Sequence, residues 1–537
     1  MTTVKRIEVT PIETISSKLD PEKFALGKRD EISFHDPLRW FLKRFKHFCS
    51  VTALHGFGHI VREDTSLGER IFWALITLTS HITALVLLWF SWNWSTLIPV
   101  VTVIESTHYA TWNIPFPAVT ICNLNKVSKK KAVVLAETMQ RPHNITAEEL
   151  ALLFDELTIF MGYTHESTSA EDFTIIDQVL KMNNATVFQI LQDLAPKCSD
   201  MLDRCMWKGT QTRCDTLFQP INTTLGICCS FNYYATGKMN YPAKLVHSIP
   251  KVPRRVTACG HQTGLSVIIS PNINDYHSTI LGSSGFRVMI HNSYDLVDDN
   301  AEMKIIGPRL EAFLSVAPEA TYATNDVLRL PVNIRKCFTP TEIPMSTVQK
   351  YSYLNCMAEC RGDIAYELCG CIPPNFPNNG SRKFCEMHDL KCILHNKNIY
   401  TGAAPGFNIT RRVPEKDEWM ISTKTVCPCL PDCDYVTYGT EVTTGIFSRN
   451  NSYNSVSFFK DINLADKSLV HVFFQDLVST RYRMDMNQNW LSWLATIGGI
   501  LGLFLGFSIV TGFEFVYLFT LRVFFDRYVE RVHGKTT

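Results

Sequence analysis

The residues with the most distinctive chemistry lie near the C-terminus, in an apolar stretch from Ile497 to Phe515. This stretch could cross a bilayer, yet it holds five glycines, one serine and one carboxylate, Glu514. Glycine tolerates backbone conformations that free carbonyl groups from a helix, and such carbonyls can replace the water around a cation. An acid in a membrane span faces protein or water. The composition therefore favours a conducting role over a simple anchor.

The same residues also have purely structural explanations. Gly498, Gly502 and Gly506 stand four positions apart, and such a stripe also serves close helix packing without any ion. That alternative stays open for Gly498 and Gly502. Glu514 could attract cations in a pore, or it could form a salt bridge to a basic residue at the inner membrane surface, such as Arg522. Both possibilities remain open from the sequence.

Two segments are long enough to span a membrane. The first contains no Asp, Glu, Lys or Arg, and the second is longer than one crossing needs, so it tilts, breaks or starts outside the bilayer. We therefore predict a cytoplasmic region at 1–70, a transmembrane helix at 71–92, an extracellular domain at 93–489, a second transmembrane helix at 490–519 and a cytoplasmic tail at 520–537.

Two independent patterns predict the orientation. Basic residues flank the outer ends of both spans, and by the positive-inside rule both termini are cytoplasmic in the plasma membrane. N-glycosylation motifs occur between the spans, which is typical of an extracellular segment of a glycoprotein. They stand at Asn144, Asn184, Asn222, Asn379, Asn408 and Asn450. A further motif at Asn93 abuts the first span.

Seventeen of the eighteen cysteines lie between the spans, a distribution typical of disulfides in an oxidising compartment. Metal binding is the alternative, but the spacings are unlike zinc motifs and no histidine pairs accompany them. We expect disulfides, no metal, and one outer cysteine that is free or paired between chains. The net charge of +1 excludes a nucleic-acid binder held by bulk charge. No nucleophile–base motif or phosphate loop indicates an enzyme, and no cofactor is expected.

The extracellular region reads as a mixed α+β domain. A capping box at Thr146 and Glu149 predicts a helix start. Further helices are predicted over 169–182, 185–198 and 351–371, the last with Cys356 and Cys360 on one face. Strands are predicted over 116–125, 265–270 and 285–297, and one long strand over 468–484 leads directly into the second span.

Several stretches together resemble one family. They are LHGFGHI (54–60), FPAVTICNLN (116–125), GFRVMIH (285–291), the cysteine set from Cys337 to Cys433, and IGGILGLFLGFS (497–508). In this order they are similar to the degenerin and epithelial sodium channel superfamily over nearly the whole chain. The chain looks most like its invertebrate branch gated by Arg-Phe-amide peptides.

The resemblance implies a homotrimer around a sodium-conducting pore in the lipid bilayer, with two spans and a hand-and-ball ectodomain in each subunit, sensitive to amiloride-type blockers. Gly506, Phe507 and Ser508 match the selectivity filter. His55, Gly56 and Glu514 match the lower pore, and Ala495, Gly498 and Gly499 match the gate. Phe507 departs from the small residue that is usual in the filter, and Tyr517 stands where a second acid is common.

The resemblance also implies disulfide pairs. They are Cys337–Cys433, Cys356–Cys429, Cys360–Cys427, Cys369–Cys392 and Cys371–Cys385. Cys122 is expected to pair with Cys228 or Cys229. Cys198, Cys205, Cys214 and Cys259 stay unassigned.

The opening stimulus is predicted to be a cationic aromatic peptide, which ion pairing and cation–π contacts could hold. Phe154, Asp155, Phe160, Tyr163 and Asp172 of the helical block are the candidate contacts. Proton-gated and constitutively active sodium channels of the same superfamily are the alternatives. Two other protein classes remain as alternatives. An ATP-gated purinergic receptor would need a cluster of Lys and Arg residues, which this sequence lacks. A two-span adhesion or receptor subunit would not need the glycine-rich span.

Overall fold

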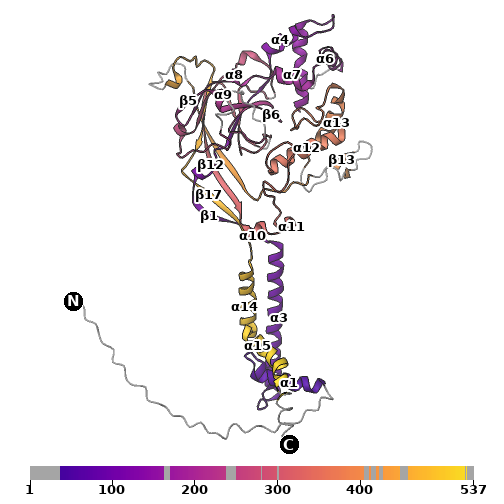
Figure 1. Cartoon of the computed structure of the whole chain (residues 1–537), viewed down its shortest axis with the longest axis vertical. Helices are drawn as coiled ribbons and strands as arrows, with labels where there is room; N and C mark the ends of the chain where they lie inside the picture. Colours follow the sequence, from indigo (N-terminus) through magenta and orange to yellow (C-terminus); the bar gives the residue numbers. More distant parts are fainter. Residues whose placement is uncertain are drawn as a thin grey trace, which may run out of the picture. The chain divides into compact units, whose positions relative to one another are not determined.

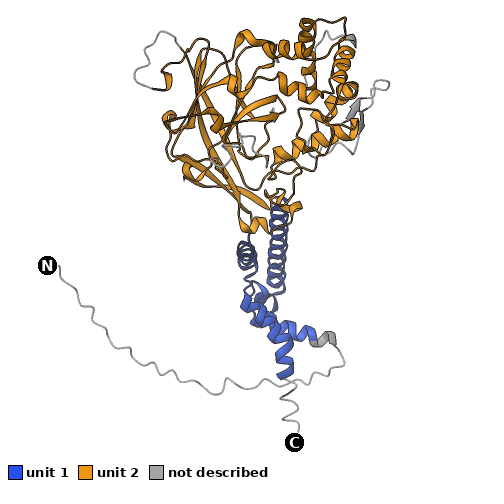
Figure 2. Ribbon diagram, turned by 45° about the horizontal axis from the view of Figure 1, so that its top comes forward, with its two compact units in different colours: residues 1–97, 488–537 blue, residues 98–487 orange. Residues whose placement is uncertain are grey.

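The computed structural model describes residues 37–161, 170–236, 250–279, 281–298, 301–403, 410–412, 419–421, 427–447, 457–525 and 528. The chain divides into two compact units, Met1–Leu97 with Gln488–Thr537 and Ile98–Asn487, which Figure 2 colours blue and orange. The first unit contains both segments predicted as spans. The second contains the segment predicted as extracellular.

The first unit is helical. Its elements are α1 (Pro37–Val51), α2 (Phe57–Val61), α3 (Leu67–Leu97), α14 (Trp490–Leu505), α15 (Ile509–Val516) and a π-helical turn, η10 (Tyr517–Leu521). α3 is long and apolar enough to cross a membrane as one helix. α14 and the helical segment Ile509–Phe525 reach that length only together, and they are bent by 71°. The excess length of the second segment therefore corresponds to a break.

The larger sheet of the second unit has the strand order β1–β17–β12–β16–β8–β4–β5, with β15 also paired to β12. Its strands are β1 (Val100–Ala110), β4 (Leu202–Trp207), β5 (Thr210–Thr212), β8 (Leu265–Ile269), β12 (Leu310–Ala323), β15 (Tyr435–Ile446), β16 (Ser468–Phe474) and β17 (Val478–Met486). β12 pairs in parallel with β16 and β17 and antiparallel with β15, so it organises the sheet (Figure 1).

A five-stranded sheet covers one face of the larger sheet, in the order β11 (Glu302–Ile306), β10 (Phe286–His291), β2 (Ala118–Asn123), β7 (Gly226–Phe231) and β6 (Phe218–Thr223). Two short pairs complete the strands, β3 (Asn125–Ser128) with β9 (Tyr276–Thr279) and β13 (Thr410–Arg412) with β14 (Trp419–Ile421). Apolar side chains from both sheets form one core, in which the ring of Phe116 contacts Trp207, Phe231 and Phe474.

Helices form the rest of the second unit. The α-helices are α4 (Lys129–Thr138), α5 (Ala147–Leu153), α6 (Ala170–Met182), α7 (Val187–Leu194), α8 (Cys198–Met201), α9 (Cys214–Leu217), α10 (Asn325–Leu328), α11 (Val332–Arg335), α12 (Tyr353–Cys369) and α13 (Leu390–Thr401). The 3₁₀ helices are η2 (Thr111–Asn113), η3 (Phe154–Met161), η5 (His261–Thr263), η6 (Ile273–Asp275), η7 (Met387–Asp389) and η9 (Ser457–Phe459). Helices α4 to α7 share a second apolar core with α12 and α13.

Local sequence signals account for several boundaries. The Thr146–Glu149 capping box is formed, since the Thr146 hydroxyl accepts from the Glu149 amide and the Glu149 carboxylate accepts from the Thr146 amide. α12 starts after Ser352, whose hydroxyl accepts from the Asn355 amide, and stops at Gly370 in a left-handed conformation.

One predicted element is corrected. The stretch 468–484 is not one strand but two, β16 and the first part of β17, with Gln475, Asp476 and Leu477 between them. At this step the chain leaves its antiparallel neighbour β8 and becomes the antiparallel neighbour of β1, while staying parallel to β12. Gln475 and Asp476 interrupt the apolar run at this step, a signal that the prediction of one strand overlooked. The change of neighbour shows how the two strands are placed.

Eight disulfides cross-link the described residues of the second unit. Five are the pairs that the resemblance implies, Cys337–Cys433, Cys356–Cys429, Cys360–Cys427, Cys369–Cys392 and Cys371–Cys385. The others are Cys122–Cys228, Cys198–Cys229 and Cys205–Cys214. Among the described residues, the free cysteines are Cys259 in the second unit and Cys49 in the first.

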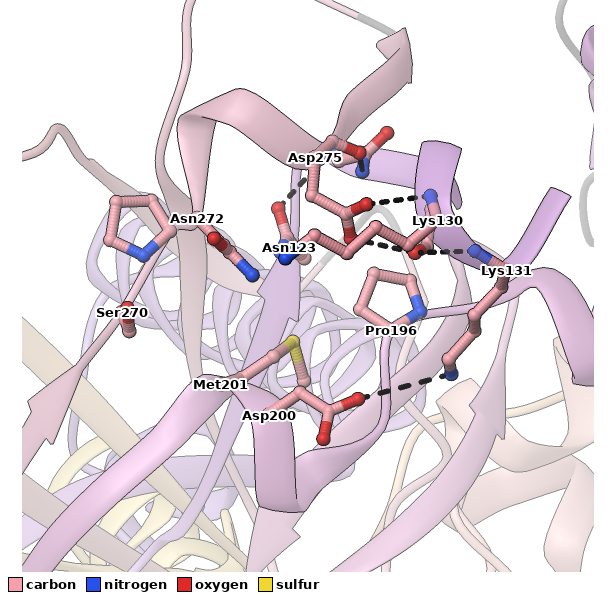
Figure 3. A pocket seen from close by; sticks show the side chains of 12 residues that line it. Asn123, Lys130, Lys131, Pro196, Asp200, Met201, Ser270, Asn272 and Asp275 are labelled. Atoms are coloured by element: carbon pink, nitrogen blue, oxygen red, sulfur yellow. Dashed lines mark hydrogen bonds and ion pairs between the residues drawn. The ribbon is translucent and has the colours of Figure 1, made fainter. Parts of the chain in front are cut away.

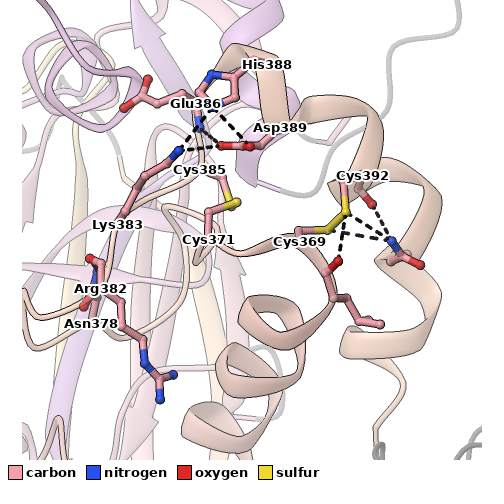
Figure 4. Close-up of a disulfide and its surroundings, with 12 residues drawn as sticks. Cys369, Cys371, Asn378, Arg382, Lys383, Cys385, Glu386, His388, Asp389 and Cys392 are labelled. Atoms are coloured by element: carbon pink, nitrogen blue, oxygen red, sulfur yellow. Dashed lines mark hydrogen bonds and ion pairs between the residues drawn. A yellow bond between two sulfur atoms is a disulfide. The ribbon is translucent and has the colours of Figure 1, made fainter.

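The disulfides at the end of α12 explain why a cluster of metal-binding residue types does not make a metal site. Cys371, Cys385 and Asp389 bring their ligand atoms close together. Both sulfur atoms are bonded to each other, however, so neither is a thiolate that could bind a metal (Figure 4). The Asp389 carboxylate instead accepts from the Glu386 amide and caps η7.

Candidate ion pathway

The second span is interrupted at residues 506–508. α14 ends where Gly506 adopts a left-handed conformation (φ 66°), which glycine reaches at little cost. Ser508 then caps α15, with its hydroxyl accepting a hydrogen bond of 3.2 Å from the Thr511 amide. Non-helical backbone at membrane depth is tolerated only where it is buried in protein or lines a water-filled cavity. The interruption therefore has the backbone character of an ion-binding constriction.

The loop that carries His55 lies directly against this interruption. The His55 amide donates a hydrogen bond of 2.9 Å to the Leu505 carbonyl. This carbonyl lies at the end of α14, so no following helical turn supplies a donor for it. The His55 ring packs on Gly506, so that a Cβ atom on Gly506 would lie 2.7 Å from the ring. Gly506 is thus needed both for its backbone conformation and for this contact.

Gly56 makes a second close approach, to α3. It has φ 86°, and a Cβ atom there would collide with the hydroxyl of Thr77. Thr77 is buried, and its hydroxyl donates to the Trp73 carbonyl at 2.8 Å. The sequence prediction did not include Thr77. The only sequence feature that marks Thr77 is a short group of polar residues inside an apolar span, which includes Thr79 and His81.

α1 fixes the N-terminal segment of the first unit against α15 and η10. The buried ring of Phe48 contacts Phe515 edge-on at 5.4 Å and Phe519 at 6.1 Å between ring centroids. Beside them the Arg522 guanidinium is 3.1 Å from Nε2 of His47. The His55 loop is therefore held from α1 on one side and from α3 on the other.

Glu514 lies on α15 below the interruption and is partly exposed. Within the part of the chain that the structure describes, its carboxylate forms no ion pair, and Arg522 contacts His47 instead. The salt bridge considered from the sequence is thus not formed in the single subunit. The acid remains accessible to a cation or to a neighbouring copy.

The gate candidates occupy one face of α14. Ala495, Gly498 and Gly499 are exposed, and a Cβ atom on either glycine would meet nothing within 4 Å. Trp493 lies near the opposite side of the helix, where its ring contacts Trp92 of α3 at 5.4 Å. The small-residue face is therefore not used for packing within the subunit.

The ring of Phe507, the unusual residue of the filter motif, packs near Gly512 of α15. The tip of the ring lies 3.5 Å from the position that a Cβ atom on Gly512 would take. This is an ordinary van der Waals distance, so the ring would tolerate a small side chain at 512. Phe507 is 40% exposed.

The sequence profile of the amiloride-sensitive sodium channel family matches residues 48–518. The chain belongs to this family. It is 27% identical over 498 residues to sodium channel protein Nach of Drosophila melanogaster, covering 90% of this chain and 88% of the relative. It is 24% identical to pickpocket protein 11 of the same species (89% and 76% covered) and 23% identical to the human bile acid-sensitive ion channel (89% and 86% covered). Members are plasma-membrane ion channels rather than enzymes and pass Na⁺ without a cofactor.

The residues predicted to bind a peptide differ in how far the structure exposes them to solvent. Phe154 and Phe160 are corrected to core residues, since they are 0% and 1% exposed in the apolar core of the helical block. Asp155 and Asp172 are partly exposed, and Tyr163 lies outside the described residues. Aromatic side chains on a helical block look alike in the sequence whether they face a core or a ligand.

The glycosylation motifs of the described residues are accessible. Asn144, Asn184, Asn222 and Asn379 are all exposed, whereas Asn408 and Asn450 lie outside the described residues. Exposure is required for modification but does not demonstrate it, so glycosylation stays a prediction.

A cavity of about 330 Å³ in the second unit is lined by polar groups that already satisfy one another (Figure 3). The Asp275 carboxylate accepts from the Ser128 hydroxyl at 2.6 Å and from the Lys130 amide at 2.8 Å, which caps α4. Lys131 donates to the Ala195 carbonyl and lies 4.0 Å from the Asp200 carboxylate. These contacts fix α4 against its neighbours and explain the cavity without a ligand.

Proposed function

We propose that this chain is the pore-forming subunit of a sodium-selective channel, assembled as a homotrimer with both termini in the cytoplasm. The observation that carries the proposal is the interruption at Gly506 with the His55 loop against it. Three copies would bring three sets of released carbonyls together around one axis. Three Glu514 carboxylates below them would concentrate cations at the inner mouth.

The first test is a current–voltage series on cells that express this chain alone. With sodium, potassium or calcium as the external cation in turn, we expect the most positive reversal potential in sodium. An amiloride-type blocker should remove the current. A chain that reaches the surface and passes no current under any stimulus, with or without the gate substitution at Ala495, would instead favour a non-conducting receptor or adhesion subunit.

We propose that an extracellular ligand opens the channel and that a peptide ending in Arg-Phe-amide is that ligand. The chain's resemblance to the peptide-gated branch supports this. So do Asp155 and Asp172, which are partly exposed acidic residues of the helical block. Since Phe154 and Phe160 are core residues, the ligand's aromatic ring must find another partner. Application of the tetrapeptide Phe-Met-Arg-Phe-amide should evoke sodium current, and current on acidification without any peptide response would reject this ligand.

A specific feature supports proton gating as the second candidate. Asp295 and Asp432 lie near the start of α12, where Asp432 accepts from the Tyr353 amide at 3.1 Å. Although Asp295 as a residue is partly exposed, its carboxyl group is enclosed. Burial, with repulsion from Asp432, raises the pKa of Asp295 to about 7. Burial also raises the pKa of Asp432 to about 6. Both groups therefore take up protons in the range in which an acid stimulus acts.

The Asp295→Asn substitution should weaken the pH dependence of both stability and current. The folded-state pKa of Asp295 lies above its unfolded value near 3.9, so its contribution is complete below about pH 4 and is lost as the pH rises through about 7. The variant should therefore unfold at a higher temperature than the wild type at pH 8, with the difference shrinking toward pH 5. Thermal unfolding of the purified full-length protein measures this.

The matched control is Asp326→Asn, which removes a mostly exposed carboxylate from α10. It should leave the pH profile unchanged. If acid evokes current in the wild type and an equal current in Asp295→Asn, this carboxyl group is not the proton sensor.

A further inference from the structure

β1 and β17 form an antiparallel ribbon that continues along the chain into both spans. Only Ile98 and Pro99 separate α3 from β1, and residues 487–489 separate β17 from α14. The Asn487 amide donates to the Pro99 carbonyl at 2.9 Å, which closes the end of the ribbon. Any displacement of the second unit that reaches the spans through the backbone passes along these two strands.

The ribbon has a weak point in its middle. Ile104 pairs with Tyr482, Ser106 with Arg481 and Tyr109 with Ser479, and the register shifts between each of these pairs. β1 therefore carries extra residues, one of which is Glu105. Bulges of this kind interrupt the ladder of backbone hydrogen bonds and let a strand bend. Without a further contact, such a ribbon would absorb movement rather than transmit it.

The side chain of Arg481 bridges this weak point. Its guanidinium lies 3.3 Å from the Glu105 carboxylate, on the bulged part of β1. It also lies over the ring of Tyr109 at 4.7 Å and over the ring of Tyr322 at 4.1 Å. The Tyr322 hydroxyl donates to the same Glu105 carboxylate at 2.7 Å. One arginine on β17 thus connects β1 and β12 through an ion pair and two stacked rings.

These contacts are not what holds the second unit folded. The side chains of Arg481 and Glu105 are about one-third exposed (32% and 29%), and an ion pair this exposed contributes little to folding. Folding rests instead on the disulfides and the apolar cores, to which the ribbon contributes partly buried side chains such as Val100, Tyr109 and Met484. Neither Arg481 nor Glu105 belongs to these cores. What the arrangement does provide is a fixed geometry at the bulges, because a planar guanidinium between two rings has few alternative positions.

We propose that Arg481 is a positioning residue that stiffens the bulged β1–β17 ribbon and so couples the second unit to the two spans. This role rests on the proposed channel function. It assigns to Arg481, Glu105 and Tyr322 an effect on opening without any effect on ion selectivity.

The stiffening is tested first without any current. Amide hydrogen exchange on the purified full-length protein should show severalfold faster exchange over 104–109 and 478–483 in Arg481→Gln than in the wild type. Arg481→Lys, which keeps the charge but not the planar fork, should be intermediate. Arg329→Gln removes the same charge from exposed α10 and should exchange like the wild type. Unchanged exchange in Arg481→Gln would overturn the proposal.

The coupling is tested by currents, with surface protein measured in parallel. Arg481→Gln and Glu105→Gln should each raise the half-maximal concentration of Phe-Met-Arg-Phe-amide, or the proton concentration needed, at least severalfold. The reversal potential should stay the same, and Arg481→Lys should restore part of the response. A wild-type response in Arg481→Gln would overturn the coupling. Silence of the wild type and of the Ala495 variant would instead refute the channel function, and the exchange data would still decide whether Arg481 stiffens the ribbon.

Discussion

Replacing Ala495 with phenylalanine should produce a standing sodium current in the absence of any stimulus. Ala495 lies on the exposed small-residue face of α14. In the proposed homotrimer, neighbouring copies of α14 would share this face when the channel is closed. Inserting a large side chain into a packed interface costs about 1–3 kcal/mol, and every 1.4 kcal/mol shifts an equilibrium tenfold. If the closed state is the tighter packing, the open state should become about tenfold more populated. Whole-cell recording before and after an amiloride-type blocker measures this current.

A matched control for Ala495→Phe is Ile497→Phe, which adds an aromatic ring two positions further along the helix. Ile497 is 37% exposed but lies about 200° around the helix from Ala495, on the side away from the small-residue face. Its variant should stay closed at rest. No standing current in Ala495→Phe at wild-type surface levels would mean that this face of α14 does not form the gate.

The Gly506→Ala substitution should abolish sodium selectivity or the current itself. Alanine in the left-handed conformation costs about 1–2 kcal/mol, and its Cβ atom would lie 2.7 Å from the His55 ring. Either the backbone at 506 changes conformation or the His55 loop moves away. Both responses displace the carbonyls that the interruption releases. We expect at least a tenfold smaller sodium current, with any remaining current reversing closer to the potassium potential.

Surface biotinylation separates this effect from misfolding, because the extracellular unit and its disulfides do not involve Gly506. Gly68→Ala at the start of α3 is the control, since a Cβ atom there meets nothing within 4 Å and its φ is ordinary. It should conduct like the wild type. A fully selective Gly506→Ala channel would exclude Gly506 from the filter.

The sequence predicted features that depend on local chemistry or on strong family motifs. The start of α5 follows from the Thr146–Glu149 pair. The length of the second span left tilting, breaking or an outside start open, and the structure has the break. The helix expected over 351–371 is present as α12 (Tyr353–Cys369). The cysteine pairs of the α12 region follow from the order of cysteines in the resembling family. Each of these signals lies within a short window or within a fixed series of residues.

The features that escaped prediction depend on contacts between distant segments. The step between β16 and β17 is marked in the sequence only by the polar pair Gln475 and Asp476, and the exchange of β8 for β1 as a neighbour depends on the tertiary fold. Burial of Phe154 and Phe160 depends on the fold of the whole helical block. The collision that restricts Gly56 involves Thr77 on another helix. Glu105 and Arg481 are likewise far apart in sequence, and no local pattern links them.

The hydrogen bond from the His55 amide to the Leu505 carbonyl ties residues that precede the first membrane helix to the break in the second. In the proposed channel, the segment around His55 would therefore be part of the ion pathway rather than a dispensable extension. Trimming, tagging or covalently modifying the chain close to His55 would then alter conductance without any change in the second unit.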